Sequence, residues 1–366
     1  MRLTNLELLN FRNYTSAALS PCPGVTVLFG DNAQGKTNLL ESIMLCCTGR
    51  SHRTSRDREL LRLDADFGSV KAEVLRGDGT HDIDIMLSLS GRKKVMVNGS
   101  QVARSGELMG HINGVLFAPE DLNMVGGGPG ERRRFIDMEL SQIRPSYYYA
   151  LQRYNRALDQ RNHILREMAA KPSAALSMPE WVHQLAVNGA AVVEYRRSFI
   201  EKLSIAANDN HLEISGGAEH LSIMYQPSLP DDTCGAALEA AYERALHDAQ
   251  RIDERRLTTT VGPHRDDIKL LIDGLDVRVY GSQGQRRTAA LSLKLSGLAV
   301  MRELTGEWPV LLLDDVMSEL DPSRRRHLIG RLKAVQTLVT CTDPGDLAGA
   351  EIGTAYRVDH GVLYSG

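Results

Sequence analysis

The chain has 366 residues, of which 42% are hydrophobic and 24% are charged. These proportions are ordinary for a folded protein of two or three units, and they exclude a disordered or collagen-like chain. The 43 basic residues are balanced by 46 acidic ones, which leaves a net charge of −3. A protein that coats nucleic acid along its whole length is expected to be strongly basic, so any nucleic-acid binding here must depend on locally grouped cations.

Five cysteines, none of them in a Cys-x-x-Cys pair, argue against a disulfide framework or a zinc site and for a reducing compartment. No apolar run approaches the ~18 residues that a membrane span needs. The first residues are more polar than those of a secretory signal peptide. We therefore expect a cytoplasmic protein that does not bind a membrane.

The first third of the chain predicts two different kinds of sheet. Val25–Phe29 is a compact apolar run typical of a central strand buried on both faces, and the apolar spacing after Thr37 predicts a helix. Between residues 69 and 101 polar and apolar residues alternate, and Asn98-Gly99 is the dipeptide most favoured at tight hairpins. This part is predicted to be an antiparallel meander, followed by a short strand at residues 114–118.

Residues 131–209 have a helical pattern with two apolar seams of about three heptads, which Pro172 and Pro179 separate. Arg161 and Asn188 are the polar breaks in these seams. An antiparallel helical hairpin, an arm reaching roughly 30 Å at 1.5 Å per residue, explains the pattern. A plain helical subdomain explains it equally well, because three heptads are the lower limit for recognising a coiled coil. The seams consist of Tyr147, Leu151, Tyr154, Leu158, Leu165 and Met168, and of Trp181, Leu185, Val192, Tyr195 and Phe199.

Strand patterns return at residues 221–225 and 268–272, and a helix is predicted to follow Ser282. Val310–Leu313 is a short apolar run that ends in two aspartates, and residues 338–340 predict one more core strand.

A phosphate-binding loop follows the strand at residues 25–29. The segment matches G-x-x-x-x-G-K-[ST] at every fixed position, between a buried strand and a helix as the motif requires. Its glycines allow a close approach of the backbone, and its N–H groups converge with the helix N-terminus on an anion. The lysine can reach the β- and γ-phosphates of ATP, and the threonine hydroxyl can ligate Mg²⁺. The loop consists of Gly30, Asp31, Asn32, Ala33, Gln34, Gly35, Lys36 and Thr37.

The aspartates that end the run Val310–Leu313 predict the second half of this site. A buried strand ending in a carboxylate can hold Mg²⁺, which we assign to Asp314, and a following acid can orient the attacking water, which we assign to Asp315. Lys36 and Asp314 lie far apart in the chain, so the meander and the helical segment are predicted to be insertions between the two halves of one site.

A third segment predicts a dimer. Ser282-Gln-Gly284-Gln opens a predicted helix shortly before Asp314, where ABC-type ATPases carry the helix N-terminus that contacts the γ-phosphate held by the opposite subunit. Ser318–Asp321 follows where such proteins place their D-loop. The order and spacing therefore predict two nucleotides enclosed between two copies of the chain.

With these motifs in place, the chain resembles the RecF family of recombination mediators, SMC-like relatives of the ABC ATPases, over essentially its whole length. The segments that carry the resemblance are Pro119–Asp137, Gly262–Asp267 and Leu312–Asp321. The chemistry of Gly262–Asp267 does not follow from its residues.

The resemblance implies an α/β fold, an ABC/SMC-like P-loop ATPase head with a mixed sheet and a meander, plus an inserted helical subdomain with a short antiparallel arm. The corresponding division is 1–120 for the first part of the ATPase lobe, 121–220 for the inserted arm and 221–366 for the C-terminal part of the ATPase. Arg12 and Asn32 would also contact the nucleotide phosphates by similarity to SMC-type heads.

The resemblance also implies ATP-dependent dimerisation on DNA and slow ATP hydrolysis. It implies the partners RecO and RecR, with which the protein would load recombinase at single-strand gaps and serve replication and the SOS response. Asp315 stands where ABC ATPases usually carry Glu, and a carboxylate shorter by one CH₂ is expected to hold the water less well. The position of a switch His is not clearly filled near Thr340–Thr342, which puts a His-based sensor in doubt.

Three basic clusters are candidates for DNA contact, although such clusters are most often solvated surface. Aromatic residues make up only 5% of the chain, which disfavours recognition by base stacking and favours backbone contact with duplex near a gap. The clusters are Arg50–Arg58, Arg92–Lys94 and Arg132–Arg134.

Two alternatives to a DNA-repair ATPase remain at this point. One is a scaffold that binds ATP without turnover, and the other is the nucleotide-binding subunit of a transporter. DNA-responsive phosphate release distinguishes the first hypothesis from both.

Overall fold

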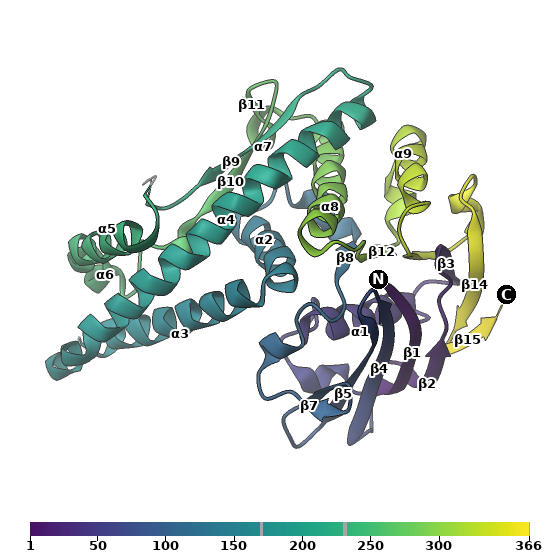
Figure 1. The fold of residues 1–366 in the computed structure, drawn as a ribbon, viewed down its shortest axis with the longest axis horizontal. Helices are drawn as coiled ribbons and strands as arrows, with labels where there is room; N and C mark the ends of the chain where they lie inside the picture. Colours follow the sequence, from purple (N-terminus) through teal and green to yellow (C-terminus); the bar gives the residue numbers. More distant parts are fainter. Residues whose placement is uncertain (169–170, 230–232, 366) are drawn as a thin grey trace.

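The computed structural model describes residues 1–168, 171–229 and 233–365. Two six-stranded sheets and the helix between them form one side of the molecule, and a helical part extends away from them (Figure 1). Within the described residues, no helix is both long and apolar enough to cross a bilayer.

The central sheet positions the functional site. Neighbouring strands of this sheet pair in parallel, except that β15 pairs with β14 in the antiparallel direction. Since parallel strands end at the same edge, the segments that follow β3, β8, β12 and β13 meet there. In spatial order the strands are β15 (Val362–Ser365), β14 (Ile352–Asp359), β3 (Val25–Phe29), β13 (Thr337–Cys341), β12 (Val310–Asp314) and β8 (Gly114–Phe117).

The apolar strand sequences arise because this sheet is covered on both faces. In β12, Leu311 and Leu313 belong to the hydrophobic cluster that contains helix α8 (Gln283–Thr305). Val310 and Leu312 point to the other side and belong to the cluster that contains helix α1 (Lys36–Thr48). In β3, the strand predicted to be buried on both faces, Val25 and Val27 belong to the first cluster and Leu28 to the second, which confirms that prediction.

The second six-stranded sheet is antiparallel throughout and packs against α1. Asn98 and Gly99 have φ angles of 50° and 75°, the positive values of a type I′ hairpin turn, so the predicted meander and its tight turn are confirmed. The sequence prediction did not join the first two strands to this sheet. Its order is β2 (Tyr14–Leu19), β1 (Arg2–Phe11), β4 (Phe67–Arg76), β5 (Gly79–Ser88), β6 (Lys94–Val97) and β7 (Ser100–Gln101).

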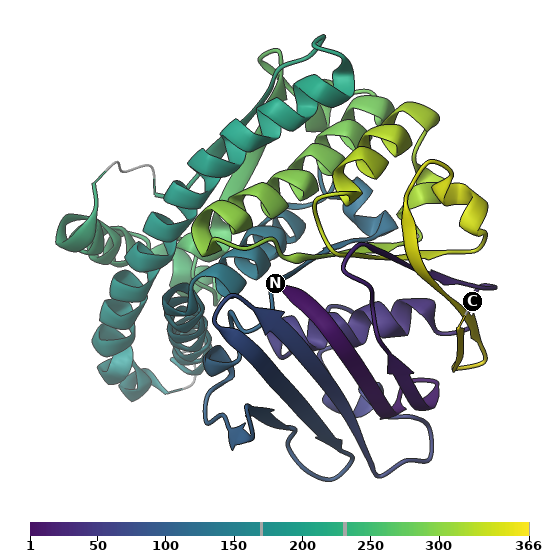
Figure 2. The ribbon, with the colours of Figure 1, turned by 45° about the vertical axis from the view of Figure 1, so that its right-hand side comes forward.

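The helical part contains the predicted hairpin, but the hairpin is not a free arm. Helices α3 (Pro145–Glu167) and α4 (Met178–Ser215) lie side by side, as both ribbon views show (Figures 1 and 2). Helix α4 also packs against α5 (Gly235–Asp248), α8 and strand β9 (Leu221–Gln226), so the hairpin is one layer of a larger helical subdomain. Pro179 does not break this helix, because it lies in the first turn of α4.

The polar breaks in the seams have structural reasons. Arg161 is buried and donates to Asp253 at 2.7 Å and to Thr259 at 2.8 Å, which joins α3 to helix α6 (Gln250–Arg256). Asn188 donates to the carbonyl of Gln184 in its own helix at 2.7 Å. The division of the chain at residues 120 and 220 stays a prediction.

The remaining elements complete the helical part and the sheet edge. The predicted strands at 221–225 and 268–272 are confirmed as two strands of a three-stranded antiparallel sheet. The strand predicted at 268–272 is β10 (Asp267–Ile272), and the third strand of this sheet is β11 (Leu275–Asp276). The helices not yet named are α2 (Pro129–Ile143), α7 (Val277–Tyr280) and α9 (Pro322–Leu332).

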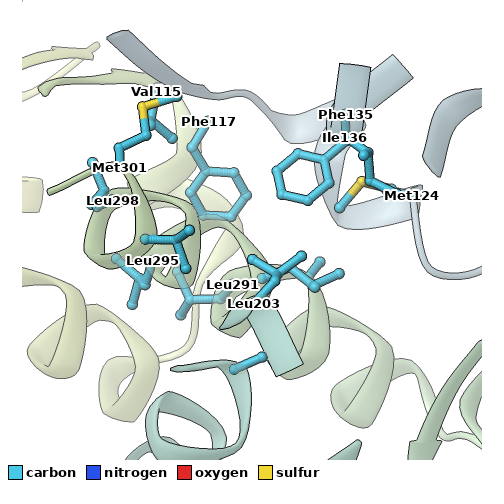
Figure 3. Packing of buried hydrophobic residues seen from close by; sticks show 14 of the residues in the cluster. Val115, Phe117, Met124, Phe135, Ile136, Leu203, Leu291, Leu295, Leu298 and Met301 are labelled. Carbon is cyan, nitrogen blue, oxygen red and sulfur yellow. The ribbon is translucent and has the colours of Figure 1, made fainter. Parts of the chain in front are cut away.

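Helix α8 is held in place by a dense apolar contact with the central sheet and with α2. Leu291, Leu295 and Leu298 of α8 are nearly inaccessible, and they lie close to Phe117 of β8 and Phe135 of α2 (Figure 3). Full burial of one such side chain contributes about 1.5–3 kcal/mol. The helix is therefore expected to move as one rigid body.

Candidate nucleotide and metal site

The phosphate loop, Gly30–Thr37, has the conformation that its glycines predict. Gly30 and Gly35 have φ angles of 145° and 119°, which disfavour side chains. A Cβ on Gly30 would lie 2.4 Å from the carbonyl oxygen of Val358, so the neighbouring strand β14 also requires a glycine there. Helix α1 begins at Lys36, and its N-terminus points into the loop.

Lys36 is buried within this loop, with 4% of its surface exposed. Its Nζ donates hydrogen bonds to the carbonyl oxygens of Gly30 at 2.6 Å and Asp31 at 3.0 Å. The ammonium therefore lies inside the ring of backbone groups that would surround a phosphate chain. Asp31, Asn32 and Ala33 are exposed along the rim of the loop.

The loop is fixed from the side by contacts that the sequence did not indicate. The carbonyl of Gln34 accepts from Asn13 Nδ2 at 2.7 Å, and its side-chain oxygen accepts from the backbone N–H of His360 at 2.6 Å. Tyr14 donates to the carbonyl of Gly35 at 3.0 Å. The side chain of Gln34 thus braces the loop against the turn between β14 and β15, while its predicted contact with nucleotide stays a prediction.

The metal side of the site brings together residues from opposite ends of the chain. Thr37 Oγ1 donates to Asp314 Oδ1 at 2.9 Å, and Thr340 Oγ1 donates to the same oxygen at 2.9 Å. Burial raises the pKa of Asp314, hydrogen bonds from the two threonines counteract this, and the nearby acids Asp315 and Glu120 raise it further. A hydroxyl and a carboxylate with excess negative charge beside it form a donor set that suits Mg²⁺.

Asp315 begins the turn after β12 in a left-handed conformation with φ 50°, which Asp tolerates better than most residues. Its N–H donates to Thr340 Oγ1 at 2.8 Å. It lines a cavity of 620 Å³ shared with Thr37 and Asp314, and also a smaller one of 310 Å³ that includes Asn32 and Thr342. Asp315 therefore lies between two cavities and lines both of them.

Glu120 is a candidate that the sequence prediction missed. It lies in the turn η3 (Pro119–Asn123) directly after β8 and lines the same cavity as Asp314 and Asp315. The sequence did indicate that a strand ends just before Glu120, at residues 114–118. Only the sheet topology shows that this strand, β8, lies beside β12.

Arg12 lies near the loop but is engaged with α1. Its Nε and Nη2 donate to the buried carboxylate of Glu41 at 2.9 and 2.7 Å, and its Nη1 donates to the carbonyl of Glu59 at 2.7 Å. Burial alone would raise the pKa of Glu41, but the hydrogen bonds from Arg12 and Ser51 outweigh burial and the pKa lies below its usual value. A nucleotide contact by Arg12 would use its further N–H donors and stays a prediction.

The signature turn, Ser282–Gln285, is separate from these groups. Ser282 is the N-cap of α8, its Oγ accepts from the N–H of Gln285 at 3.1 Å, and the side chain of Gln285 accepts from the N–H of Ser282 at 2.9 Å. Ser282 is exposed and is not among the residues that line the cavity shared by Thr37, Asp314 and Asp315. The predicted helix is confirmed and Ser282 caps it, whereas a contact of Ser282 and Gly284 with nucleotide stays a prediction.

The segment Ser318–Asp321 is attached to the signature turn of the same chain. Arg324 Nη2 donates to the carbonyl of Gly284 at 2.9 Å, and Arg287 Nη1 donates to the carbonyl of Glu319 at 3.0 Å. The two segments that the sequence assigns to a dimer interface are thus joined into one unit.

One predicted basic cluster is wrong in part. Arg132 is buried, with 3% of its surface exposed, and forms a two-point ion pair with Asp267 at 2.7 and 2.8 Å. It stabilises the attachment of α2 to β10 and is not on the surface. Arg133 and Arg134 instead line a groove of 910 Å³.

This groove, called the basic groove below, gathers parts of all three predicted clusters. Its cationic side chains outnumber its carboxylates, Asp57 and Asp137, and His52 and Arg53 line both the groove and the 620 Å³ cavity beside Asp314. The cations that line it are Arg50, Arg53, Lys93, Arg133 and Arg134.

The segment Gly262–Asp267 is structural. Asp266 is buried and accepts from the N–H of Ser228 at 2.7 Å, while Arg196 donates to the carbonyl of Pro263 at 2.7 Å. His264 accepts from Tyr154 at Nδ1 and donates from Nε2 to the carbonyl of Thr259 at 3.0 Å, and burial lowers its pKa to about 4. This polar network ties the base of the hairpin to α2, β9 and β10.

Comparisons with known proteins agree with this geometry. Residues 2–361 match a family model described as the RecF/RecN/SMC N terminal domain. A protein of Lachnoclostridium phytofermentans named DNA replication and repair protein RecF is 41% identical over 100% of both chains, and one of Alkaliphilus oremlandii with the same name is 44% identical over 93% of both. The chain belongs to the RecF family.

Solved structures place the fold in the same group. A structure described as the recombination mediator protein RecF-ATPrS in the RecFOR pathway has a TM-score of 0.93 and 37% identity, and covers 100% of this chain and 98% of its own. A structure described as the same protein with ATP has a TM-score of 0.91 and 36% identity, over 100% of this chain and 97% of its own. An SMC head bound to a domain of ScpA, at a TM-score of 0.58 and 16% identity over 100% of this chain and 97% of its own, shares the fold alone. The predicted ABC/SMC-like head is therefore confirmed.

Proposed function

We propose that this chain is an ATP-binding, slowly ATP-hydrolysing protein of recombinational DNA repair. It dimerises on DNA with ATP between two copies, and with RecO and RecR it helps to load recombinase at single-strand gaps, which serves replication and the SOS response. Membership of the RecF family supports the repair role, and the similarity to a solved recombination mediator protein of the RecFOR pathway supports a place in that pathway.

The observation that carries the dimer mechanism is that the phosphate loop and the signature turn lie apart within one chain. The phosphate loop and the metal-side residues are assembled by a single copy, with Thr37 on Asp314 at 2.9 Å. The signature turn is exposed elsewhere, with its helix N-terminus available to an external anion. A second copy that presents its signature turn to the first copy's nucleotide completes the site.

Each residue in the assembled site has a distinct task. Lys36 and the loop N–H groups neutralise and orient the phosphates, and Thr37 and Asp314 hold Mg²⁺, which when bound offsets the charge on the phosphate oxygens. Asp315 lines the cavity that Thr37 and Asp314 also line, and in the proposed site it orients water for attack on the γ-phosphate. Its short side chain fits a slow hydrolase that uses ATP as a timer for the closed state.

The basic groove supports contact with a DNA backbone. Its cations come from three separate segments of the chain, and the groove adjoins the cavity beside Asp314 through His52 and Arg53. Neutralising phosphates with such side chains releases counterions, so binding is expected to weaken steeply with salt.

Phosphate release measured with and without duplex or gapped DNA tests this proposal. We expect slow release that DNA accelerates, and sedimentation that shows dimers only when ATP is present. ATP binding without release would favour the non-hydrolytic scaffold, and release that ignores DNA would contradict the repair function.

A further inference from the structure

Helix α8 carries a buried lysine halfway along its length. Lys294 is 2% exposed, its Nζ donates to the carbonyl of Leu116 at 2.8 Å, and it lies 3.0 Å from Asp121 Oδ1. The ammonium also lies 5.2 Å from the ring centre of Phe135. A buried ammonium is costly unless it is paired, so these partners fix the position of the lysine relative to β8 and the turn η3.

The turn that Lys294 holds carries an acid of the candidate site. Asp121 caps this turn, because its Oδ2 accepts from the N–H of Ala118 at 2.9 Å. Glu120 is the adjacent residue, and it borders the cavity that contains Thr37 and Asp314. The ion pair of Lys294 with Asp121 therefore fixes the backbone of the turn that carries Glu120, whose exposed side chain lines the cavity.

A second carboxyl group, that of Glu139, lies near the lysine, whose charge counteracts part of the rise in the pKa of this carboxyl. Glu139 of α2 is 1% exposed, and burial raises its pKa to about 8. Among the described residues its Oε2 has no hydrogen-bond partner, and it packs against Gly297 of α8. The ion pair that Lys294 forms is with Asp121, at 3.0 Å.

The other end of α8 carries the signature turn. Ser282 and Lys294 are separated by about 18 Å of the same helix, at 1.5 Å per residue. Of the residues between them, Ala289, Ala290, Leu291 and Leu293 are buried, and Leu291 lies near Phe117 of β8 and Phe135 of α2 (Figure 3). Ser282 and Lys294 therefore belong to one continuous helix, which contacts the turn η3 through Lys294.

We propose that Lys294 is a positioning residue for ATP hydrolysis, which acts through Asp121 to hold Glu120 beside the metal-side carboxylates and links that turn to the helix carrying Ser282. Glu120 then supplies a third carboxylate around the attacking water. This inference rests on the proposed ATPase function and assigns a control element to the same site.

A double-mutant cycle tests the inference. We expect Lys294→Met and Asp121→Asn each to lower kcat about tenfold or more, since small displacements of positioned groups cost factors of this size. ATP affinity, measured by equilibrium binding, should stay within about twofold, because neither residue belongs to the phosphate loop. In a Glu120→Ala background neither substitution should lower kcat further.

Lys202→Met is the matched control. It removes an exposed ion pair between α4 and α8, with Glu303, and should leave kcat unchanged. If Lys294→Met fails to fold, Asp121→Asn decides the matter alone, since Asn can still accept from the N–H of Ala118.

Equal losses of kcat with and without Glu120 would show a purely structural role and overturn the inference, as would full kcat in folded Asp121→Asn. A failure of the proposed function itself is separate, because it would appear as phosphate release that survives Lys36→Ala.

Discussion

The phosphate loop and the signature turn are both helix N-termini that suit an anion, but they are built differently. The loop before α1 encloses Lys36, which is 4% exposed, and Tyr14 and Asn13 brace it from outside. The turn before α8 is exposed, and its own capping box satisfies the hydroxyl of Ser282. The first is built within one chain, whereas the second lies on the surface, where the proposed mechanism has it meet the nucleotide of another copy.

The largest effect is expected from a substitution in the phosphate loop. Lys36→Ala should weaken ATP binding by about hundredfold or more, because several charge-assisted hydrogen bonds of about 1.5–3 kcal/mol each are lost. ATP-dependent dimerisation should be lost with it. Equilibrium binding of a fluorescent ATP analogue measures this, and unchanged affinity would refute the role of the lysine.

Lys36→Arg sharpens the same test. A planar guanidinium keeps the charge but cannot replace a point ammonium within the loop, so we expect binding to persist and turnover to be lost.

A substitution in the signature turn should separate ATP binding from dimer formation. Ser282→Arg should leave ATP binding by the monomer intact and abolish the ATP-induced dimer, because a bulky cation replaces the cap at the surface that meets the partner. Loss of the cap should also cost about 1 kcal/mol of folding stability. Light scattering with ATP is the measurement, with Ser282→Asn, which keeps a cap, as the control for stability.

Asp315→Asn should affect neither binding nor assembly but should slow hydrolysis. Asn tolerates the left-handed φ of 50° at this position, so the fold should be kept. Loss of the carboxylate should reduce the single-turnover rate by about a hundredfold, the usual contribution of a positioned base. A rate equal to that of the unchanged chain would remove Asp315 from the mechanism.

The pH dependence of Mg²⁺ binding reports on the metal side. Burial raises the pKa of Asp314, so the carboxylate is protonated at a higher pH than an ordinary Asp. Metal binding requires the ionised form, and the affinity for Mg²⁺ should therefore fall with decreasing pH, starting above the usual range of Asp. Titration of the ATP-bound protein with Mg²⁺ at several pH values measures this, and Asp314→Asn should abolish the dependence.

The smallest effect is expected in the basic groove. Arg50→Ala should weaken DNA binding several-fold at any sequence and lower the slope of log affinity against log salt by about one. Arg244→Ala on the exposed surface of α5 is the matched control and should change neither. An unchanged salt slope in Arg50→Ala would place the DNA elsewhere.

The sequence could predict the features that contiguous residues encode, but not the contacts between distant residues. The phosphate loop, the strand before Asp314 and the cap of α8 are encoded by contiguous residues, because strand, turn and helix patterns are local. Arg132 was wrongly grouped with Arg133 and Arg134, because its partner Asp267 lies 135 residues away and a run of arginines does not reveal which one is buried.

Glu120 was missed for a related reason. It reaches the site only because β8 lies beside β12 in the central sheet, and that neighbour relation comes from a crossover between distant segments. Gly262–Asp267 had no derivable chemistry, since its partners Tyr154, Arg196 and Ser228 lie in three other elements. The roles of these residues depend on contacts between distant segments, which no local sequence pattern reveals.

Mixing two defective variants tests the central claim most directly. Lys36→Ala lacks a working phosphate loop and Ser282→Arg lacks a working signature turn, so each alone should be inactive. In a mixed pair, the intact loop of one copy faces the intact turn of the other, and ATP-dependent association with phosphate release should reappear. If the mixture stays as inactive as its components, or if Ser282→Arg alone hydrolyses ATP at the full rate, the shared site does not exist.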